Sequence, residues 1–449
     1  MRSVDFVSDQ TIDTSEPKRD GAFVAFRYRN FRWMWSASLL SSSGSWLQMV
    51  AVPYVIYTIT GSGAWLGFAG FLGYAPMVIT GPYAGSVADR FDRRKVLIIG
   101  GMIQAAITFV LWFEWVSGVR NIAFFLVILT LGAFAGGFTV ASWQSFVTEL
   151  VPREHLLNAV TLNSAQFNAA RAFGPALGGV VLATLGVSWC FFFNAVSFLA
   201  MVGGLLVISV PPLARAVKVG KSRPIAEMRD ALRYVRTVPG IVTCLIVVFS
   251  LGMLGGPLFN LLVVFATDVY KIGDGAYGLL AGCLGAGAII VAPIVAGAGG
   301  RASRSRVLTI AMVAYGVALV ALGAAPVVLV GAAALLVAGA GYLGITASLN
   351  TTVQLQVKEE MRGRTMALYL MVLTAAVPLG ALVQGWLVDI IGVQKTVAGA
   401  GVLFLSVFLV LRFVLNRLST MDAVDHAFGA EDALHIAEAE ATEAAIDPI

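Results

Sequence analysis

The sequence predicts an all-α membrane protein with twelve transmembrane helices in two pseudo-symmetric six-helix bundles. Three observations lead to this fold class: long apolar runs, an uneven distribution of basic residues, and a repeat between the two halves of the chain. Of the 449 residues, 58% are hydrophobic and only 12% are charged, whereas a soluble domain carries about 25% charged residues. Most of the chain is therefore expected to lie in lipid.

Each apolar run is long enough for a helix that crosses the bilayer core, which takes about 20 residues. The runs are continuously apolar, whereas the strands of a membrane barrel alternate between apolar and polar residues, so a barrel is not expected. The twelve runs cover approximately residues 33–59, 64–88, 96–116, 122–147, 158–185, 189–210, 241–267, 276–298, 307–325, 327–350, 365–388 and 395–415.

The basic residues predict the orientation of these spans. With the N-terminus in the cytoplasm, the 30 Lys and Arg residues divide into 26 inside, 3 outside and 1 within a span, Arg171. Because positive residues accumulate on the cytoplasmic side of membrane proteins, this orientation is preferred over the reverse. We expect a multi-pass protein of the plasma membrane with both termini in the cytoplasm.

A polar linker separates two sets of six spans. Its residues 225–238 place apolar side chains at helical spacing with arginines between them, which fits either a helix on the inner leaflet or a solvated tether. We divide the chain into a cytoplasmic N-terminal tail (1–30), a first bundle (31–210), a cytoplasmic linker (211–238), a second bundle (239–418) and an acidic cytoplasmic tail (419–449).

The two bundles repeat each other in sequence. The segment GSGAW at 61–65 returns as GDGAY at 273–277. The segment DRFDRRKVL at 89–97 returns as GRASRSRVL at 300–308, without the acids of the first copy. Parallel repeats of this kind are a known plan of transporters, with the substrate site near the midplane between the halves.

Two motifs resemble those of the major facilitator superfamily. Gly85-x-x-x-Asp89-Arg90-x-x-Arg93 resembles its loop motif between spans two and three, and GPALGG at 174–179 resembles the core of its antiporter motif. The opening stretch from 30 to 70 and VKEEMRGRTMALY at 357–369 are similar to the branch of enterobactin exporters and drug-efflux proteins. The resemblance covers about residues 28–417.

This resemblance implies a secondary transporter that exports a small amphipathic molecule, siderophore- or drug-like, by alternating access and proton antiport. The chain departs from the pattern at Asp92, where the loop motif usually has glycine, and at Ser45, where relatives often carry an acid. An importer or facilitator of a small solute, and a polytopic sensor that does not transport, stay open as alternatives.

The charged loop has two interpretations. It is either a topology signal alone, or a latch as well. The resemblance implies that Asp89, Arg90 and Arg93 form a charge cluster with Glu149, at the end of span four, which locks the two halves together when the transporter opens outward. Gly85 is expected to let the loop and the helices approach closely.

Arg171 lies near the centre of span five. A charge at bilayer depth costs at least about 2.5–3.5 kcal/mol on insertion scales, so its side chain should face protein or a water-filled cavity. It either makes a structural pair or belongs to the substrate site, which would then favour anionic or phenolate-bearing substrates. Asn168, three residues earlier, lies on the same helix face.

Other intramembrane positions are candidates for contact with substrate or for helix packing. An isolated polar residue in a membrane helix joins neighbouring helices at least as often as it binds a ligand. The candidate contacts are Gln48, Trp143, Asn260 and Tyr342. The candidate packing surface of span five is Gly174, Pro175, Gly178 and Gly179.

No cluster of His, Cys or acidic residues has the spacing of a metal or catalytic site, so we expect neither an enzyme nor a cofactor beyond a proton gradient. GAGYLG at 339–344 matches a nucleotide-binding fingerprint but lies inside a span, where close packing explains it. The expected partners are a small-molecule substrate and the lipid bilayer, without nucleic acid, and we expect a monomer.

Overall fold

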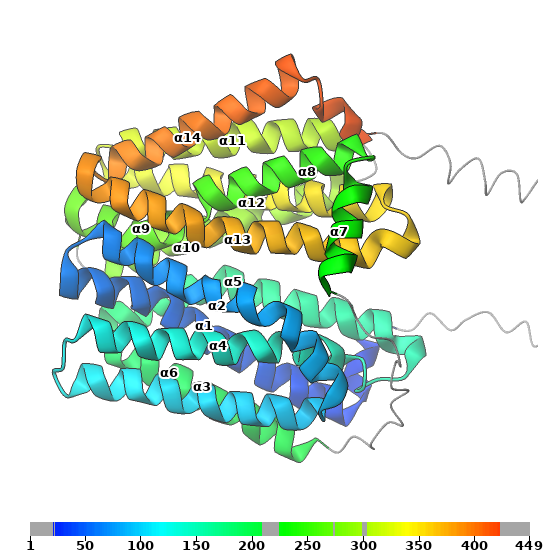
Figure 1. The fold of residues 1–449 in the computed structure, drawn as a ribbon. Coiled ribbons are helices and arrows are strands. Elements are labelled where there is room, and N and C mark those ends of the chain that lie inside the picture. Colours follow the sequence, from blue (N-terminus) through cyan, green and yellow to red (C-terminus); the bar gives the residue numbers. More distant parts are fainter. Residues whose placement is uncertain (1–20, 22, 209–223, 273, 299–302, 423–449) are drawn as a thin grey trace, which may run out of the picture.

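A computed structural model describes residues 21, 23–208, 224–272, 274–298 and 303–422, and this part of the chain is almost entirely helical. Of the regions predicted from the sequence, residues 1–20 and 22 of the N-terminal tail, 211–223 of the central linker and 423–449 of the C-terminal tail lie outside the described residues. Figure 1 shows long helices running side by side in two groups.

The first group holds α1 (Arg29–Thr60), α2 (Gly63–Arg90), α3 (Arg93–Val116), α4 (Ile122–Val147), α5 (Leu156–Leu185) and α6 (Val187–Val207). Short 3₁₀ turns precede α1 and α5, at Val24–Arg27 (η1) and Arg153–His155 (η2). Within this group α1 packs on α5 and α6, α3 on α4 and α6, and α2 on α4. We call these helices the first half.

The second half begins with a composite helix of α8 (Pro239–Ser250), the π-helical η3 (Leu251–Gly255), α9 (Leu258–Val264) and the π-helical η4 (Phe265–Val269). It continues with α10 (Asp274–Ala298), α11 (Arg304–Ala324), α12 (Val328–Gln356), α13 (Glu359–Ile391), α14 (Val393–Leu409), η5 (Val410–Val414) and η6 (Leu418–Asp422). Here α11 packs on α12 and α14, and α10 packs on α12. The halves meet where α2 packs on α13 and α5 packs on α10.

Ten helices in the described residues are long and apolar enough to cross a membrane. Large apolar side chains such as Ile99, Leu329 and Phe413 are exposed on their outer surfaces, which is typical of a surface that faces lipid. The chain is therefore a multi-pass membrane protein. The sequence predicts twelve spans, and the two helices missing from the ten are α1 and α5.

Polar residues explain why α1 and α5 are not among the ten helices that are apolar enough to cross a membrane. Helix α1 begins with two arginines and carries four serines and a glutamine near its middle, and only Phe173–Leu185 of α5 forms an apolar segment. Both helices are nevertheless 30 residues or longer, and a bilayer core takes about 20 residues.

The short helix α7 (Pro224–Val235) lies across one end of the second half (Figure 1). Ala231 and Val235 are buried in the core of that half, while Arg229 and Arg233 are exposed. The Tyr234 hydroxyl accepts a hydrogen bond of 3.1 Å from the Lys358 amide. The linker helix is thus docked on protein, which neither of the two interpretations drawn from its sequence anticipated.

The molecule has two ends, which we call the terminal face and the opposite face. The terminal face carries α7, the start of α1 and the end of α2, and the opposite face carries the turn between α1 and α2 (Figure 1). On the opposite face, single glycines join α5 to α6 and α13 to α14. Gly186 and Gly392 have φ of 89° and 83°, which a residue with a Cβ rarely adopts. The same one-residue link thus closes both halves.

Candidate functional site

A cavity of about 190 Å³ lies where the two halves meet. Helices α1, α2 and α4 of the first half and α9 of the second half line it. Most of the lining is apolar, and the polar side chains in it are uncharged: Ser45, Gln48, Tyr74 and Asn260. An apolar wall with a few placed polar groups is the usual composition of a small-molecule site.

Gln48 is fixed on one side of this cavity by neighbouring helices. Its Oε1 accepts hydrogen bonds from Asn194 Nδ2 of α6 at 2.6 Å and from Thr108 Oγ1 of α3 at 3.2 Å. The Asn194 side chain, 1% exposed, accepts in turn from Ser197 Oγ at 3.2 Å. The side-chain carbonyl of Gln48 thus joins three helices beside the cavity.

Asn260 enters from the second half through a break in the composite helix. Pro257 starts α9 directly after the π-helical turn η3, and proline provides no N–H for the preceding turn. Gln384 of α13, only 4% exposed, donates from Nε2 to the carbonyl oxygens of Met253 at 2.9 Å and Leu254 at 3.0 Å. Because backbone groups in lipid must be satisfied by protein, this side chain stabilises the break that positions Asn260.

Sequence reasoning did not identify Gln384 as a candidate. It is a lone amide in the apolar stretch VPLGALVQGWLV, as the candidates Gln48 and Asn260 are in theirs. A proline and paired glycines at 255–257 mark the helix that it supports, but the sequence does not show that the two helices are neighbours.

The structure brings Gln48 and Asn260 to one cavity and leaves Trp143 and Tyr342 outside it. Trp143 packs against a separate apolar cluster that includes Phe31 at the start of α1. The Tyr342 ring lies 6.3 Å from the ring of Tyr315 inside the second half. Arg171 and Asn168 lie in α5, but their side chains are outside the described part of the structure.

The glycines of span five form contacts on two sides of α5. A Cβ on Gly174 would overlap the Trp46 side chain of α1, and one on Gly178 would lie 3.0 Å from Val50 Cγ2. Gly179 faces the other half, where a Cβ would overlap the backbone of Gly278 in α10. Pro175 is buried between these glycines without ending the helix.

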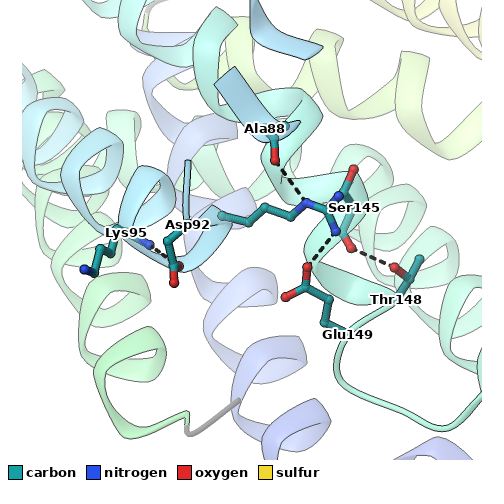
Figure 2. A network of polar contacts seen from close by, with 7 residues as sticks. Ala88, Asp92, Lys95, Ser145, Thr148 and Glu149 are labelled. Atoms are coloured by element: carbon teal, nitrogen blue, oxygen red, sulfur yellow. Dashed lines mark hydrogen bonds and ion pairs between the residues drawn. The ribbon is translucent and has the colours of Figure 1, made fainter. Parts of the chain in front are cut away.

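The charged loop at the terminal face joins elements of the first half only. Arg93 Nη1 lies 2.6 Å from Glu149 Oε1, with the two side chains 21% and 12% exposed. Arg93 Nε donates to the carbonyl of Ala88 at the end of α2 at 3.3 Å. Figure 2 shows Glu149 and Ala88 converging on one guanidinium group, with Asp92 to the side. The pair therefore ties α2, α3 and the end of α4 together.

Among the described side chains, no hydrogen bond or ion pair joins the charged residues at 90–95 to the second half in this conformation. Asp92 caps α3 by accepting a hydrogen bond of 3.1 Å from the Lys95 amide. Arg90 is exposed. The close approach expected at Gly85 is absent, because this residue is exposed and a Cβ on it would meet nothing within 4 Å. The Asp89 side chain lies outside the described part of the structure.

The two halves touch near the opposite face and stand apart near the terminal face. A Cβ on Gly63 would lie 2.6 Å from Val388 of α13, and one on Gly67 would overlap the Ala381 carbonyl. Toward the terminal face, glycines at 81 and 85 in α2 and at 363 in α13 have open space around them. This arrangement explains the missing contact at Gly85, since the ends that would meet there are separated.

Known proteins match most of the chain. The sequence profile of the transmembrane secretion effector family matches residues 20–441. The MFS-type transporter YkuC of Bacillus subtilis (strain 168) is 27% identical over 57% of this chain, which spans 64% of that relative. The multidrug efflux pump Tap of Mycolicibacterium fortuitum is 26% identical over 86% of this chain and 95% of the pump.

Two further comparisons agree. The staphyloferrin A transporter of Staphylococcus aureus (strain NCTC 8325 / PS 47) is 21% identical over 86% of this chain and 96% of that protein. A bacterial homolog of the human lysosomal transporter Spinster, solved in an inward-facing and unoccupied conformation, has the same fold with a TM-score of 0.67, at 16% identity over 86% of this chain and 97% of that one. The chain thus belongs to the transmembrane secretion effector family of the major facilitator superfamily.

Proposed function

We propose that this protein exports a small amphipathic molecule by alternating access between two six-helix bundles. The observation that carries the proposal is the cavity containing Gln48 and Asn260. Residues from both halves line it, and the glycine contacts between the halves that the structure describes lie toward the opposite face. A site between two bundles that meet at one end is the arrangement that alternating access requires.

Twelve spanning helices follow if α1 and α5 also cross the bilayer. Both pack against other membrane helices of the first half, and α5 also packs on α10 of the second half. Their polar residues include Gln48, which is bound by α3 and α6 rather than exposed to lipid. Spans that line an interior site need fewer apolar residues than spans surrounded by lipid, and this supports counting both.

The orientation proposed is with the terminal face in the cytoplasm. Arginines and lysines concentrate there, in the loop at 90–95 and on α7 at Arg229 and Arg233. The opposite face carries only Arg120, Lys271 and Lys395. This asymmetry supports a cytoplasmic terminal face by the rule that positive residues stay inside. The conformation is then inward-facing.

The substrate class proposed is siderophore- or drug-like. Relatives that match nearly their whole length are an efflux pump for multiple drugs and a transporter of staphyloferrin A. The described cavity lining offers apolar surface with hydroxyl and amide groups, which suits an amphipathic molecule. Arg171 would add a preference for anionic compounds if its guanidinium group reaches the same space.

The charge cluster of Arg93 and Glu149, together with Asp89 and Arg90, is proposed as the latch of the outward-facing state. In the present conformation the pair already joins three elements of the first half. We infer that this preformed cluster contacts the second half when the terminal ends close, and that Gly85 then lies against that half.

Proton antiport is proposed as the driving force. No acid lies mid-span, so the proton must be carried by an acid near one end of the helices. The candidates at the opposite face are Glu114, Asp268 and Asp389. Glu114 is 5% exposed, and neither of its carboxyl oxygens has a hydrogen-bond partner among the described residues. Without such a partner a buried carboxylate is costly, which supports Glu114 as a proton carrier.

Transport into inside-out membrane vesicles tests the function. Vesicles with and without the protein are given a siderophore, a macrolide and a cationic dye, with an acid interior that provides the gradient. Accumulation that needs the protein and disappears with a protonophore is the expected result. If no compound accumulates, export is rejected, and if accumulation is unchanged by the protonophore, antiport is rejected.

Arg171 gives a test of the substrate class. Arg171→Lys keeps the charge but loses the planar fork that binds carboxylates, whereas Arg171→Gln removes the charge. We expect partial transport of anions with Lys, little with Gln, and a shift of Gln toward neutral or cationic compounds. Abundance in the membrane is measured first. A well-folded Arg171→Gln that transports anions like the parent excludes Arg171 from the site.

A further inference from the structure

Helix α2 begins without a cap from its own chain segment. Ser62 precedes the first turn, yet its side chain accepts no hydrogen bond from the N–H groups of α2. Asp389, at the end of α13 and 326 residues away, takes that place. Its carboxylate accepts from Gly63 N at 2.6 Å, from Ala64 N at 3.1 Å and from Ser62 Oγ at 2.6 Å.

The hydrogen bonds to Asp389 stabilise the N-terminus of α2 in two ways. The first N–H groups of any α-helix lack partners inside the helix, and the positive end of its dipole favours a negative charge. Here the second half of the protein supplies both the acceptors and the charge to a helix of the first half. The N-terminus of α2 is therefore complete only while the halves are in contact at the opposite face.

A second acid makes a similar contact nearby. Tyr57, in the last turn of α1, donates its hydroxyl to Asp268 Oδ2 of η4 at 2.5 Å. Asp268 and Asp389 are both exposed, and neither has a Lys or Arg partner in the described part of the chain. Apart from the neighbouring Thr267 hydroxyl, their partners come from the first half.

On the basis of the alternating access proposed above, we propose that Asp389 and Asp268 are gating residues that hold the opposite face closed. Opening on this side separates α13 from α2 and η4 from α1, and all four hydrogen bonds must then break. Closure forms them again. The two acids thus determine how much of the population is inward-facing.

Ser62 makes the exchange reversible at low cost. In the closed state its hydroxyl donates to Asp389. Once the acid withdraws, the same hydroxyl is free to turn and accept from an N–H in the first turn of α2, as serine does at the starts of many helices. The helix exchanges a cap from the other half for a cap from its own sequence, so at least one N–H of its first turn keeps a protein acceptor in the open state.

Among the described residues, hydrogen bonds of this kind join α2 to α13 and α1 to η4, but not α5 to α10. The end of α5, which meets α10, has no acid between 172 and 186, and those two helices touch through Gly179 and Gly278 instead. The polar contacts described between the halves therefore lie at α2 with α13 and at α1 with η4.

Distances between spin labels at Val119 and Val327 test the gate. These residues are exposed, lie in turns of the opposite face and belong to different halves. The native Cys190, Cys244 and Cys283 are first replaced, and the protein is studied in lipid nanodiscs without substrate or gradient. The experiment measures a distance and not transport. Its result therefore tests the gate independently of whether the protein exports any compound.

Asp389→Ala should lengthen the distance and raise the ratio of open to closed molecules about tenfold, because hydrogen bonds to an ionised group are commonly worth that factor. Ser62→Asp should act in the same direction, since it caps α2 directly and repels Asp389. Tyr57→Phe should give a smaller shift. Asn121→Ala is the matched control, because Asn121 caps α4 on the same face within one half.

Unchanged distances in both Ser62→Asp and Tyr57→Phe, with normal helix content and a single peak in gel filtration, would overturn the proposal. A shift of equal size in Asn121→Ala would also overturn it, because loss of any cap on that face would then suffice. If Asp389→Ala does not fold, Ser62→Asp and Tyr57→Phe still decide, since they remove no buried packing.

Discussion

The terminal and opposite faces use their charges in different ways. At the terminal face, where the sequence has its densest charged loop, Arg93 and Glu149 bind each other inside one half. At the opposite face, which has few charges, Asp389 and Asp268 bind residues of the other half. A dense group of charges in a loop thus need not mark a contact between the halves, whereas the hydrogen bonds between the halves come from a few residues at helix ends.

The glycines show the same contrast. Gly179 lies against the backbone of Gly278 across the interface, while Gly85 has open space around it. One glycine is required by the present conformation, and the other is required, on our proposal, only by the conformation in which the terminal ends close. Substitution of Gly179 should therefore lower stability, whereas substitution of Gly85 should lower transport.

The largest effect is expected at the glycine contact. Gly179→Leu forces α5 and α10 apart, and because the contact is backbone against backbone the cost should be about 3 kcal/mol or more, the upper end for overpacking. Gly85→Leu should leave thermal stability unchanged but reduce transport at least as strongly, because it blocks closure of the terminal face. Thermal unfolding in detergent and vesicle uptake are measured for both. If Gly179→Leu and Gly85→Leu lose the same amount of stability, the two glycines do not differ in the way proposed.

The next effect concerns the ion pair. Arg93→Ala leaves Glu149, 12% exposed, without its cation, at a cost of about 2–3 kcal/mol after allowance for partial exposure. Adding Glu149→Gln should cost less than the sum of the two changes, since the residues share one network. Arg304 occupies the matching position of the second half, and its buried Nη1 has no acceptor among the described residues. Arg304→Ala should therefore cost less, and an equal cost would favour a topology signal over a latch.

A smaller effect is expected at the cavity, where Gln48 holds neighbouring helices together and Asn260 is proposed to contact the substrate. Gln48→Leu deprives Asn194 and Thr108 of their acceptor and should lower stability by about 1–3 kcal/mol. Asn260→Leu should leave stability nearly unchanged and alter the apparent KM of transported compounds. Chemical unfolding and concentration-dependent uptake measure the two quantities. A stable Gln48→Leu with normal uptake would place Gln48 outside both roles.

The smallest effect is expected at Arg90. Its side chain is exposed, and surface substitutions usually change stability by less than about 0.5 kcal/mol. Arg90→Gln should unfold like the parent and lose some transport at low salt, where charge interactions of the closed terminal face count most. Identical uptake at low and high salt would remove Arg90 from the latch.

The sequence was sufficient for the membrane class and for most helices, because continuous apolar runs have few other solutions. It also singled out Gln48 and Asn260 as amides in apolar runs, and the structure places both in the lining of one cavity; their contact with substrate stays a prediction. Hydropathy selects ten spans among the described residues rather than twelve. Helices α1 and α5 carry polar groups toward other protein, such as Gln48 and Gln166, and hydropathy does not distinguish polar residues that face protein from those that face water.

The contacts between the halves could not be predicted from the sequence. Asp389 and Ser62 are 327 residues apart, and each resembles an ordinary polar residue at the end of a helix. Gly85 is part of a recognisable motif, yet its contact depends on the conformation adopted. Gln384 supports a break in another helix, so its role appears only when the two helices are seen side by side.

The turns of the opposite face are one to five residues long. With that face outside the cell, the protein would expose almost no loop that an antibody, a phage or a soluble extracellular partner could bind. Binders raised against intact cells should therefore be rare and should recognise the rims of helices. Binding reagents for imaging are better directed to the cytoplasmic side, where α7 and the loop at 90–95 offer folded polar surface.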